Sequence, residues 1–391
     1  MAGGDEVNRM FLFVPIGVGL MIGSVLTIAY VRSPVSAVPV DDFRVMSDFE
    51  WAQVENNDLQ RGRRILPELV QPESIAFDEH DNLYTGLKGG RVVKIINPGK
   101  ANQSVINLTE SFDYAKESKR NKKRPLGFRL HGSKLYFADA FQGVIMIDSE
   151  SHTYDVIVDF NDVSPPLLFL DDLTITSDGK TIYFTDMSLK WNYDDVTLAI
   201  TEGDCTGRLF KVDVLTKNTE LILDSLCLPN GIEIVENETH VLLSEHNYRR
   251  ITLVNLESAK VVRHIPLPAG PNNIRKRKNG GYWVAMLYIP EPGHFVTWAP
   301  VFRQILAGAL GSDGTLTKFN LSQGVAVKLN ENFEPESIHL DLEGKLSQGV
   351  TEVSELSDGT LALGSAISNG ITLVDPLPPP VDPLLSTDVS T

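Results

Sequence analysis

The sequence predicts an all-β fold, a six-bladed β-propeller preceded by an N-terminal single-pass transmembrane helix. The first observation is a recurring unit of two short strands joined by a tight turn. Its clearest copy is Phe169–Ser188, where β-branched and aromatic residues fill Leu173–Thr176 and Thr181–Thr185, and Asp178-Gly179 supplies the turn. The second observation is the spacing of the second-strand residues by 52, 47, 59, 41 and 78 positions: Tyr84, Tyr136, Tyr183, Leu242, Trp283 and Leu361. A two-sheet sandwich is the alternative, but six copies of one unit favour radial repetition.

The six units follow one another along the chain, with enough strand-like sequence between them for about four strands each. They are Ser74–Leu87, Gly127–Asp139, Phe169–Ser188, Gly231–Glu245, Asn272–Leu287 and Val353–Gly364. The long last interval contains an insertion at about residues 288–316. Within it, the mostly apolar segment Trp298–Leu310 can form a helix, which would be either a packed cap over the propeller or a lid or membrane-facing surface.

An uncharged apolar run at residues 11–31 precedes the predicted propeller. Its 21 residues are enough for a helix to cross a hydrocarbon core, and they exceed the apolar region of a cleaved signal peptide. We therefore interpret it as a transmembrane signal anchor after a short tail at residues 1–10. Gly19 and Gly23 form a G-x-x-x-G pair that can seat a homodimer of membrane helices, or they reflect the ordinary glycine content of such a helix.

The rest of the chain divides into three segments. Residues 32–60 are expected to be a stalk and entry segment, residues 61–375 the propeller, and residues 376–391 an extended Pro-rich tail. Four glycosylation sequons agree with a single-pass type II protein of the plasma membrane or an endomembrane, with its propeller extracellular or lumenal. The sequons begin at Asn102, Asn107, Asn237 and Asn320.

The composition argues against some classes of function. The chain has 35 Lys and Arg residues against 51 Asp and Glu residues, a net charge of −16, so its surface repels nucleic-acid phosphates. The basic runs Lys116–Arg124 and Arg275–Lys278 are expected to be a solvated loop and a solvated hairpin turn, with contact to an anionic surface or glycan as the alternative. Cys205 and Cys227 lack zinc or iron–sulfur spacing, and either form one disulfide in an oxidising compartment or stay unpaired.

Polar residues stand just before the first strand of four units. They are Glu73, Asp171 with Asp172, Asn230, and Asn272 with Asn273. Because equivalent positions of propeller blades surround one axis, these side chains should converge at one mouth of the channel. All are oxygen donors, and calcium accepts irregular oxygen shells more readily than magnesium does. The predicted calcium ligands are Glu73, Asp171, Asn230 and Asn272, and the alternative is that each residue caps a turn.

Catalytic residues are harder to identify. No G-x-S-x-G elbow or Ser–His–Asp arrangement is evident, so nucleophilic catalysis has little support. His246 follows a predicted inner strand and either borders the channel or is an ordinary loop residue. The favoured chemistry is a calcium ion that polarises a carbonyl or a water, with Asp172 and His246 as the candidate catalytic residues.

Several segments together resemble the strictosidine synthase-like propellers, and within them the membrane-anchored adipocyte plasma membrane-associated protein group with its insect hemomucin relatives. The resemblance covers about residues 60–375. It is carried by PESIAFDEHDNLYTGLKGGRVVKI, RPLGFRL, LYFADAFQGV, DDLTITSDGKTIYFTDMS, GRLFKVD, LPNGIEI and NNIRKRKNGGYWVAM.

The resemblance implies a six-bladed propeller on a type II anchor, arylesterase-like hydrolysis, and an axial calcium like that of paraoxonase-type and gluconolactonase-type propellers. Glu73 and Asn230 match the ligand positions of those propellers. In the third unit an Asp stands where those propellers have an Asn, and in the fifth unit an Asn stands where they have an Asp. Where the plant synthases carry their catalytic Glu, this chain has Thr351 followed by Glu352, which argues against their condensation reaction. The paired catalytic histidines of the paraoxonases have no evident match.

Two functions are therefore expected. The first is a membrane-anchored, calcium-dependent hydrolase of small aryl esters or lactones. The alternative is a non-catalytic propeller ectodomain that binds a ligand or partner and holds a structural calcium.

Overall fold

The structure is a computed structural model. It describes residues 4–40, 46–52, 56–114, 122–290, 294, 299–316 and 321–377, and for residues 4–17 and 316 it describes the backbone alone. The sequon residue Asn320, the beginning of the Trp298–Leu310 segment and the tail beyond residue 377 lie outside the described residues.

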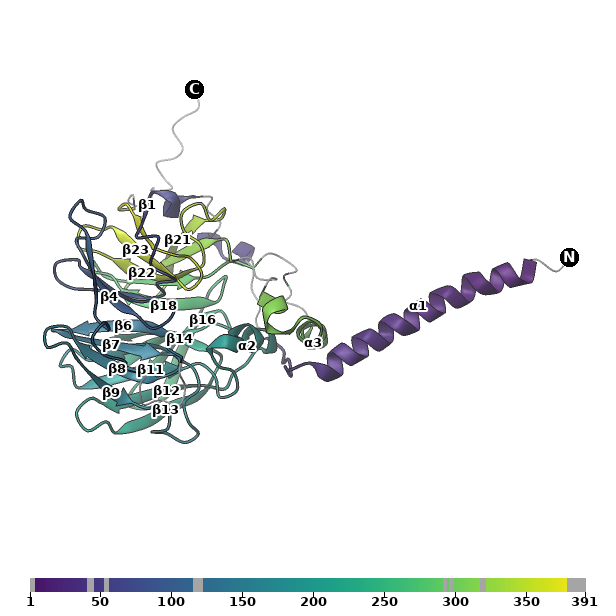
Figure 1. Ribbon diagram of the computed structural model, residues 1–391, viewed down its shortest axis with the longest axis horizontal. Helices are drawn as coiled ribbons and strands as arrows, with labels where there is room; N and C mark the ends of the chain where they lie inside the picture. Colours follow the sequence, from purple (N-terminus) through teal and green to yellow (C-terminus); the bar gives the residue numbers. More distant parts are fainter. Residues whose placement is uncertain are drawn as a thin grey trace, which may run out of the picture.

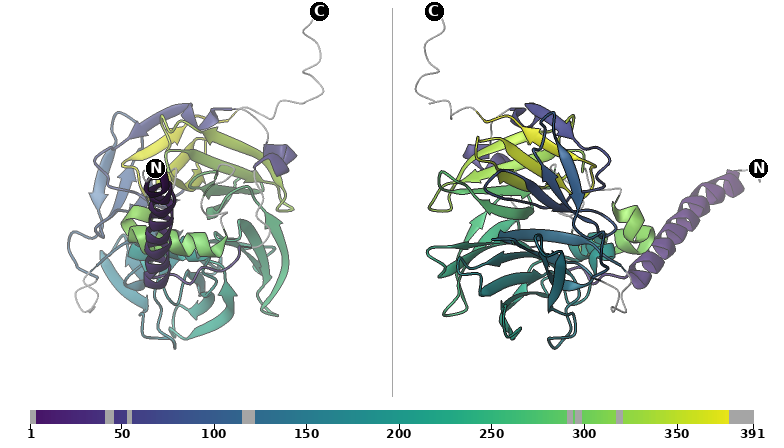
Figure 2. Two further views of the ribbon diagram at one scale, coloured as in Figure 1. Left: turned by 90° about the vertical axis from the view of Figure 1, so that its right-hand side faces the viewer. Right: turned by 60° about the vertical axis from the view of Figure 1, so that its left-hand side comes forward.

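Six four-stranded antiparallel sheets surround a central axis, which confirms the predicted six-bladed propeller (Figures 1 and 2). Blade one contains β2 (Ile75–Phe77), β3 (Leu83–Gly86), β4 (Val92–Ile96) and β5 (Ser104–Asn107). Blade two contains β6 (Pro125–His131), β7 (Lys134–Asp139), β8 (Gly143–Asp148) and β9 (Thr153–Val158). Blade three contains β10 (Leu170–Ile175), β11 (Thr181–Asp186), β12 (Gly207–Asp213) and β13 (Thr219–Leu226).

The other three blades repeat the pattern. Blade four contains β14 (Pro229–Val235), β15 (His240–Glu245), β16 (Arg250–Asn255) and β17 (Lys260–Pro266). Blade five contains β18 (Pro271–Lys276), β19 (Tyr282–Met286), β20 (Gly324–Leu329) and β21 (Pro335–Asp341). Blade six contains β22 (Val350–Glu355), β23 (Leu361–Ser365), β24 (Ile371–Val374) and, at its outer edge, β1 (Gly62–Ile65).

The ring closes through β1, a strand that is not among those predicted from the sequence. This strand pairs antiparallel with β24, from Gly62 opposite Val374 to Ile65 opposite Ile371. Blade six is therefore built from both ends of the propeller segment. Separating those ends breaks a row of backbone hydrogen bonds, so the pairing fastens the ring.

The hydrophobic core is divided among the interfaces between neighbouring blades. The innermost strands β2, β6, β10, β14, β18 and β22 contact one another in a closed ring. Between blades one and two, Phe128 stacks on Phe137 with ring centroids 5.2 Å apart, and Tyr84 belongs to the same buried cluster. Because both faces of each sheet are packed, residues at the inner ends of the blades are held in fixed positions.

Three helices lie at one end of the propeller axis: α1 (Gly4–Arg32), α2 (Val196–Glu202) and α3 (Pro300–Leu316). The described part of the predicted insertion is largely α3, which packs against α2 and the end of α1. The buried Arg303 donates to the carbonyl of Thr201, at 2.8 Å, and to that of Val38. Gly308 permits close contact with α1, because an added Cβ would lie 1.8 Å from the Ala29 carbonyl oxygen. The insertion therefore forms part of a packed cap.

Helix α1 contains the apolar run at residues 11–31 and projects from the capped end of the propeller (Figures 1 and 2). Its apolar side chains from Val18 to Val31 are mostly exposed, Leu20 by 69%. Ala29 is buried against α3, and the Cβ positions of Gly19 and Gly23 face open space.

Within the described part of the chain, no helix is both long and apolar enough to cross a membrane.

Candidate functional site

Three of the four predicted ligand positions, Asp171, Asn230 and Asn272, lie at irregularities within the innermost strands, whereas Glu73 lies just before β2. In blades two to six, the pairing of the first strand with the second shifts register near its start, for example between Leu170 and Leu173 in blade three and between Pro229 and Ile232 in blade four. Such bulges re-aim side chains away from the sheet faces. Polar residues at these positions can therefore point along the axis of the propeller.

A cavity of about 380 Å³ lies at this point of the axis, under the cap. Every blade contributes a residue from the start of its innermost strand or, in blade one, from just before it: Glu73, Leu126, Asp171, Asn230, Asn272 and Thr351. The four predicted calcium ligands therefore line one cavity. Helix α2 adds Val196 and Ile200, and the end of α3 adds Ser312 and Asp313. A mostly apolar pocket with a few convergent polar groups is typical of small-molecule sites.

Four oxygen atoms in this region are buried without a hydrogen-bond partner among the described residues. They are Glu73 Oε2, Asp171 Oδ2, Asn230 Oδ1 and Asn273 Oδ1. Asn273 also donates to Glu73 Oε1 at 3.4 Å, whereas Asn272 Oδ1 accepts from the Asn273 backbone at 3.1 Å. Buried oxygens are rarely left unpaired, and oxygens from four blades suit a hard cation. The sequence identified the pair at residues 272 and 273 but not that Asn273 carries the unpaired oxygen.

The charges along the axis do not balance. Five carboxylates, from Glu73, Asp171, Asp172, Glu233 and Glu352, interact there with three guanidinium groups, from Arg124, Arg129 and Arg275. With all five ionised, the carboxylates exceed these three guanidinium groups by two, and the Lys276 ammonium also acts on Glu233. Burial raises the pKa of Glu73 to about 8, and it also raises the pKa of Asp171 well above its usual range. Within the described residues, His, Cys, Asp and Glu alone form no cluster of three suited to a metal.

Asp172 does not face the cavity, and its position does not support the predicted catalytic role. Its Oδ2 lies 2.8 Å from Nη1 of Arg275 and accepts from the Ile232 backbone at 3.1 Å, and its Oδ1 lies 3.4 Å from Nη1 of Arg129. The Arg275 guanidinium also pairs with Glu352, whose Oε2 is 2.6 Å from Nη2. A carboxylate that is engaged in this way neutralises buried cations and is not available as a base.

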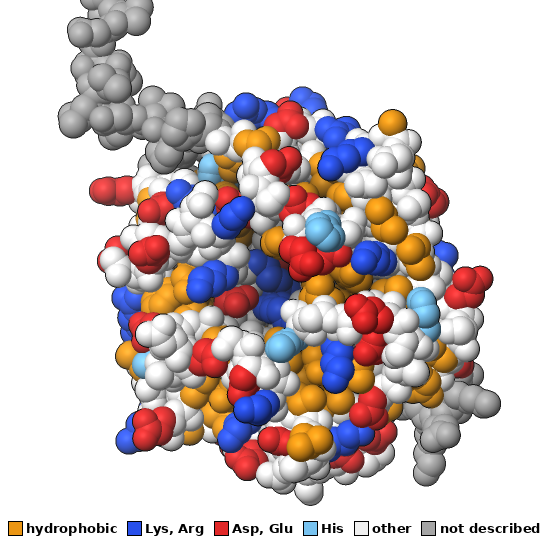
Figure 3. Space-filling model, turned by 90° about the vertical axis from the view of Figure 1, so that its left-hand side faces the viewer, with side chains coloured by type: hydrophobic (Ala, Val, Ile, Leu, Met, Phe, Trp, Pro, Cys, Tyr) orange, Lys and Arg blue, Asp and Glu red, His pale blue; other side chains and the backbone are white. Residues whose placement is uncertain are grey.

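The same network corrects the expectation for the basic runs. Arg275 and Arg124 are buried, so neither is part of a solvated turn or loop, although residues 116–121 lie outside the described residues. Arg124 donates to the Tyr193 hydroxyl at 3.0 Å and to the Gln71 carbonyl at 2.9 Å. On the face opposite the cap, Figure 3 shows a central hollow that contains Lys and Arg side chains. Guanidinium groups therefore occupy the channel below and beside the cavity.

His246 lies just after β15 and lines the cavity. Of its two predicted positions, the structure therefore shows the one that borders the channel. Burial lowers the pKa of its imidazole to about 4, and a hydrogen bond to the Pro271 backbone partly opposes this shift. The ring is therefore neutral at neutral pH. Because one ring nitrogen donates to a carbonyl, the other is an acceptor.

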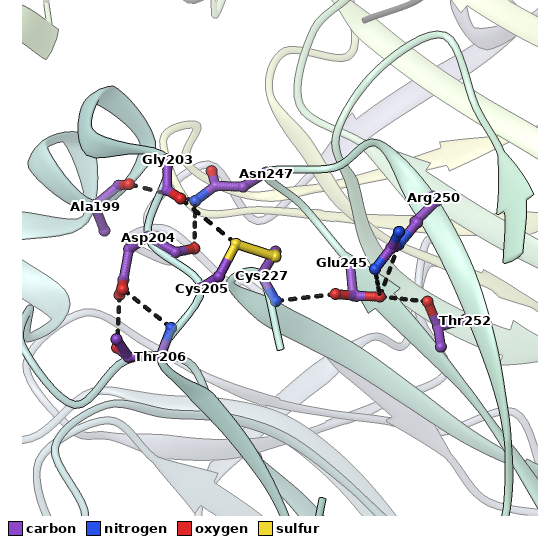
Figure 4. Close-up of a disulfide and its surroundings, with 10 residues drawn as sticks. All are labelled: Ala199, Gly203, Asp204, Cys205, Thr206, Cys227, Glu245, Asn247, Arg250 and Thr252. Carbon is purple, nitrogen blue, oxygen red and sulfur yellow. Dashed lines mark hydrogen bonds and ion pairs between the residues drawn. A yellow bond between two sulfur atoms is a disulfide. The ribbon is translucent and has the colours of Figure 1, made fainter. Parts of the chain in front are cut away.

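Cys205 and Cys227 form a disulfide in the structure (Figure 4). It joins the segment after α2 to the start of blade four, where the Cys227 backbone donates to Glu245 at 2.9 Å. Asn247 binds the same segment, because its Nδ2 donates to the Asp204 carbonyl at 2.9 Å. These contacts hold α2, a wall of the cavity, against blade four.

Three predicted glycosylation residues lie at the periphery of the propeller. Asn102 and Asn237 are exposed in turns, and Asn107 is half-buried in β5. The Asn107 Oδ1 accepts from the backbone and hydroxyl of Thr109, the third residue of its own sequon, at 3.1 and 2.9 Å. Modification at these positions stays a prediction.

The fold and the cavity define a class: six-bladed propellers with a polar site on the axis. Comparison with known proteins narrows it further, because family models match at residues 54–95 (strictosidine synthase-like, N-terminal) and 171–256 (strictosidine synthase). The human adipocyte plasma membrane-associated protein is 30% identical over 93% of this chain and 89% of its own length. The cattle protein of that name is 32% identical over 88% of this chain and 87% of its own. The chain belongs to the strictosidine synthase-like family.

Solved structures confirm the propeller fold at low sequence identity. The calcium-binding protein regucalcin of Agrobacterium tumefaciens superposes with a TM-score of 0.50 at 11% identity, covering 80% of this chain and 92% of its own. A candidate gluconolactonase gives a TM-score of 0.51 at 10% identity, with 80% and 91% covered. These likenesses establish the fold alone.

Proposed function

We propose that this protein is a calcium-dependent hydrolase of small aryl esters or lactones, with its site in the axial cavity. One observation carries the proposal: four buried oxygens from four blades have no hydrogen-bond partner among the described residues, and three of their residues, Glu73, Asp171 and Asn230, line a mostly apolar cavity of about 380 Å³. An apolar binding space directly above a set of cation ligands is suited to an uncharged, carbonyl-containing substrate.

The residues present fit a calcium ion. Glu73, Asp171, Asn230 and Asn273 would hold it, since each has an oxygen without another partner. Its two charges would offset the excess of buried carboxylates. When bound, calcium supplies Lewis acidity that polarises a carbonyl group or a water.

The chain's own groups have separate tasks. Phe169, Tyr288 and Ile200 form apolar walls that bind an aryl or alkyl group and exclude water. The neutral His246 presents an acceptor nitrogen to the cavity and can take a proton from the attacking water. The hydrogen bond to Pro271 keeps this imidazole in one orientation.

The relatives are consistent with this proposal. Among structures of the same fold, one is described as a calcium-binding regucalcin and another as a candidate gluconolactonase. Thr351 and the ion-paired Glu352 stand where the plant synthases carry a catalytic Glu, so a strictosidine-type condensation is not proposed.

The test is hydrolysis of phenyl acetate by the full-length chain in detergent, with calcium and with a chelator. We expect turnover with calcium, loss of most of it on chelation, and loss in Asn230→Ala. Asn218→Ala, at an exposed turn, is the matched control. Calcium-dependent thermal stabilisation without turnover would instead favour the non-catalytic ligand- or partner-binding ectodomain.

We also propose that α1 anchors the protein in a membrane as a type II protein, with the capped end of the propeller toward the bilayer. The exposed apolar residues of α1 and the membrane-associated relatives support this. Extraction of membranes from expressing cells with alkaline carbonate should leave the full chain in the pellet and release a chain that lacks residues 1–32. Release of both would contradict anchoring by α1.

A further inference from the structure

A second set of reactive side chains lies on blade five, outside the axial cavity. His339 of β21 has its Nδ1 2.8 Å from Asp58 Oδ2 and its Nε2 2.9 Å from Ser337 Oγ. A carboxylate, an imidazole and a hydroxyl are thus joined in the order and through the nitrogens of a hydrolase triad. No such arrangement is evident from the sequence, because Asp58 lies 281 residues from His339.

The fold brings these three residues together in a simple way. Ser337 and His339 are two positions apart on one strand, so their side chains share a face. Asp58 is in the 3₁₀ turn η3 (Asp58–Gln60), which packs against β21. Asn56 fixes that contact, because it donates to the Ile338 carbonyl and accepts from the Leu340 backbone, both at 2.9 Å.

The proton positions favour an activated serine. Burial lowers the pKa of His339, although Asp58 opposes this shift, so the imidazole is neutral at neutral pH. An ionised Asp58 can only accept, so the proton of the ring is on Nδ1. Nε2 is then an acceptor, and Ser337 must donate its hydroxyl proton to it. The edge of the buried Trp283 ring, 5.4 Å away between centroids, restricts rotation of the imidazole.

A cation stands beside the serine. Lys328 is directly opposite Ser337 in the pairing of β20 with β21, so the two side chains lie on the same face. Its ammonium group is 2.8 Å from Glu336 Oε2, and its charge also lowers the pKa of His339. This charge can stabilise an oxyanion that forms on a carbonyl attacked by Ser337. Ser337 is half-buried, so a small reagent can reach it from solvent.

We propose that Ser337, activated by His339 and Asp58, is a nucleophile that accepts the acyl group of small activated esters at a site independent of calcium. The Ser337 Oγ–acyl bond forms as the ester C–O bond breaks. The hydroxyl proton passes to His339 Nε2 and then to the leaving alcohol or phenol. Water hydrolyses the acyl-serine, with the same imidazole as base, and releases a carboxylic acid.

The first test is labelling of the full-length protein with a fluorophosphonate probe in the presence of chelator, followed by mass spectrometry of the labelled peptide. We expect the label on Ser337, at least tenfold less in His339→Gln, and an intermediate loss in Asp58→Asn. Ser151→Ala removes an exposed serine and is the matched control. The unfolding midpoint of each variant shows whether it is folded. A wild-type protein without label on Ser337, or equal label in a folded His339→Gln variant, would overturn the proposal.

The second test separates this site from the axial one. Phenyl acetate hydrolysis that persists in chelator and is lost in Ser337→Ala belongs to blade five, whereas hydrolysis lost on chelation and in Asn230→Ala belongs to the axis. Chelator-resistant turnover that Ser337→Ala leaves unchanged would contradict the nucleophilic role of Ser337 without affecting the axial proposal.

Discussion

Calcium binding at the axis should release protons, because the ligands are protonated before the cation arrives. Burial raises the pKa of Glu73 to about 8 from an ordinary value of 4.5, and it also raises that of Asp171. At pH 7, Glu73 is mostly neutral in the absence of calcium. A carboxylate must be ionised to bind calcium, so the proton is expelled on binding.

The size of the effect follows from the difference between the pKa and the pH. Ionising Glu73 costs on the order of 1 kcal/mol at pH 7 and roughly twice that at pH 6, since each pH unit adds about the same cost. The apparent dissociation constant for calcium should therefore rise about tenfold from pH 7 to pH 6 through this proton alone. Asp171 shifts in the same direction and can add a second proton.

Isothermal titration calorimetry of the full-length chain measures this linkage. Titrations with calcium at pH 6, 7 and 8, each in two buffers of different ionisation enthalpy, count the protons released per ion. Glu73→Gln should weaken binding and release about one proton fewer, while Glu79→Gln, at an exposed turn, should match the wild type. An affinity for calcium that does not change with pH, or an equal number of protons released by Glu73→Gln, would refute the hypothesis that Glu73 is a buried ligand that is protonated before calcium binds.

Three further predictions concern the walls and the base of the cavity. His246, with a pKa of about 4 against about 6.5 in the unfolded chain, takes up a proton on unfolding between those values. Stability should therefore fall by about 2 kcal/mol from pH 7 to pH 5 through this group, and urea unfolding of His246→Gln should lack that share. Replacement of Cys205 and Cys227 by serine should cost about 3 kcal/mol in urea unfolding, because the disulfide closes a loop between positions 22 residues apart. An equally stable double variant would contradict this. Gly127→Ala should cost about 1–3 kcal/mol and lower the unfolding midpoint, because its Cβ would lie 2.0 Å from Asp172 Oδ1. An unchanged unfolding midpoint would contradict this and show that Asp172 can move to make room for the added methyl group.

The fold could be predicted because each blade repeats its own local signals. Alternating residues and a tight turn specify a hairpin without reference to the rest of the chain. Strand β1 could not be predicted because Gly62–Ile65 is a short segment with two arginines. Its pairing with β24 joins residues more than 300 positions apart. Ring closure is a property of the whole chain and leaves little trace in any window of sequence.

The residues that line the cavity could also be predicted from the repeats, but the buried residues behind them could not. Matched positions in repeated blades identified Glu73, Asp171, Asn230 and Asn272 as neighbours, since symmetry converts spacing into geometry. At a bulge, however, two adjacent residues face different layers, so spacing cannot decide which of Asn272 and Asn273 has the unpaired oxygen.

The buried arginines show why ion pairs are harder to predict from the sequence than strands are. A basic residue near a turn is usually solvated, and Arg275 was interpreted in that way. In the structure it lies between Asp172 and Glu352, where two carboxylates from other blades hold it in place. The repeats predict which residues of different blades occupy equivalent positions. A buried arginine that neutralises carboxylates of other blades occurs once, so the repeats do not predict its position. The contact between Asp58 and His339 could not be predicted for the same reason, because it joins residues 281 positions apart that do not occupy equivalent positions of two blades.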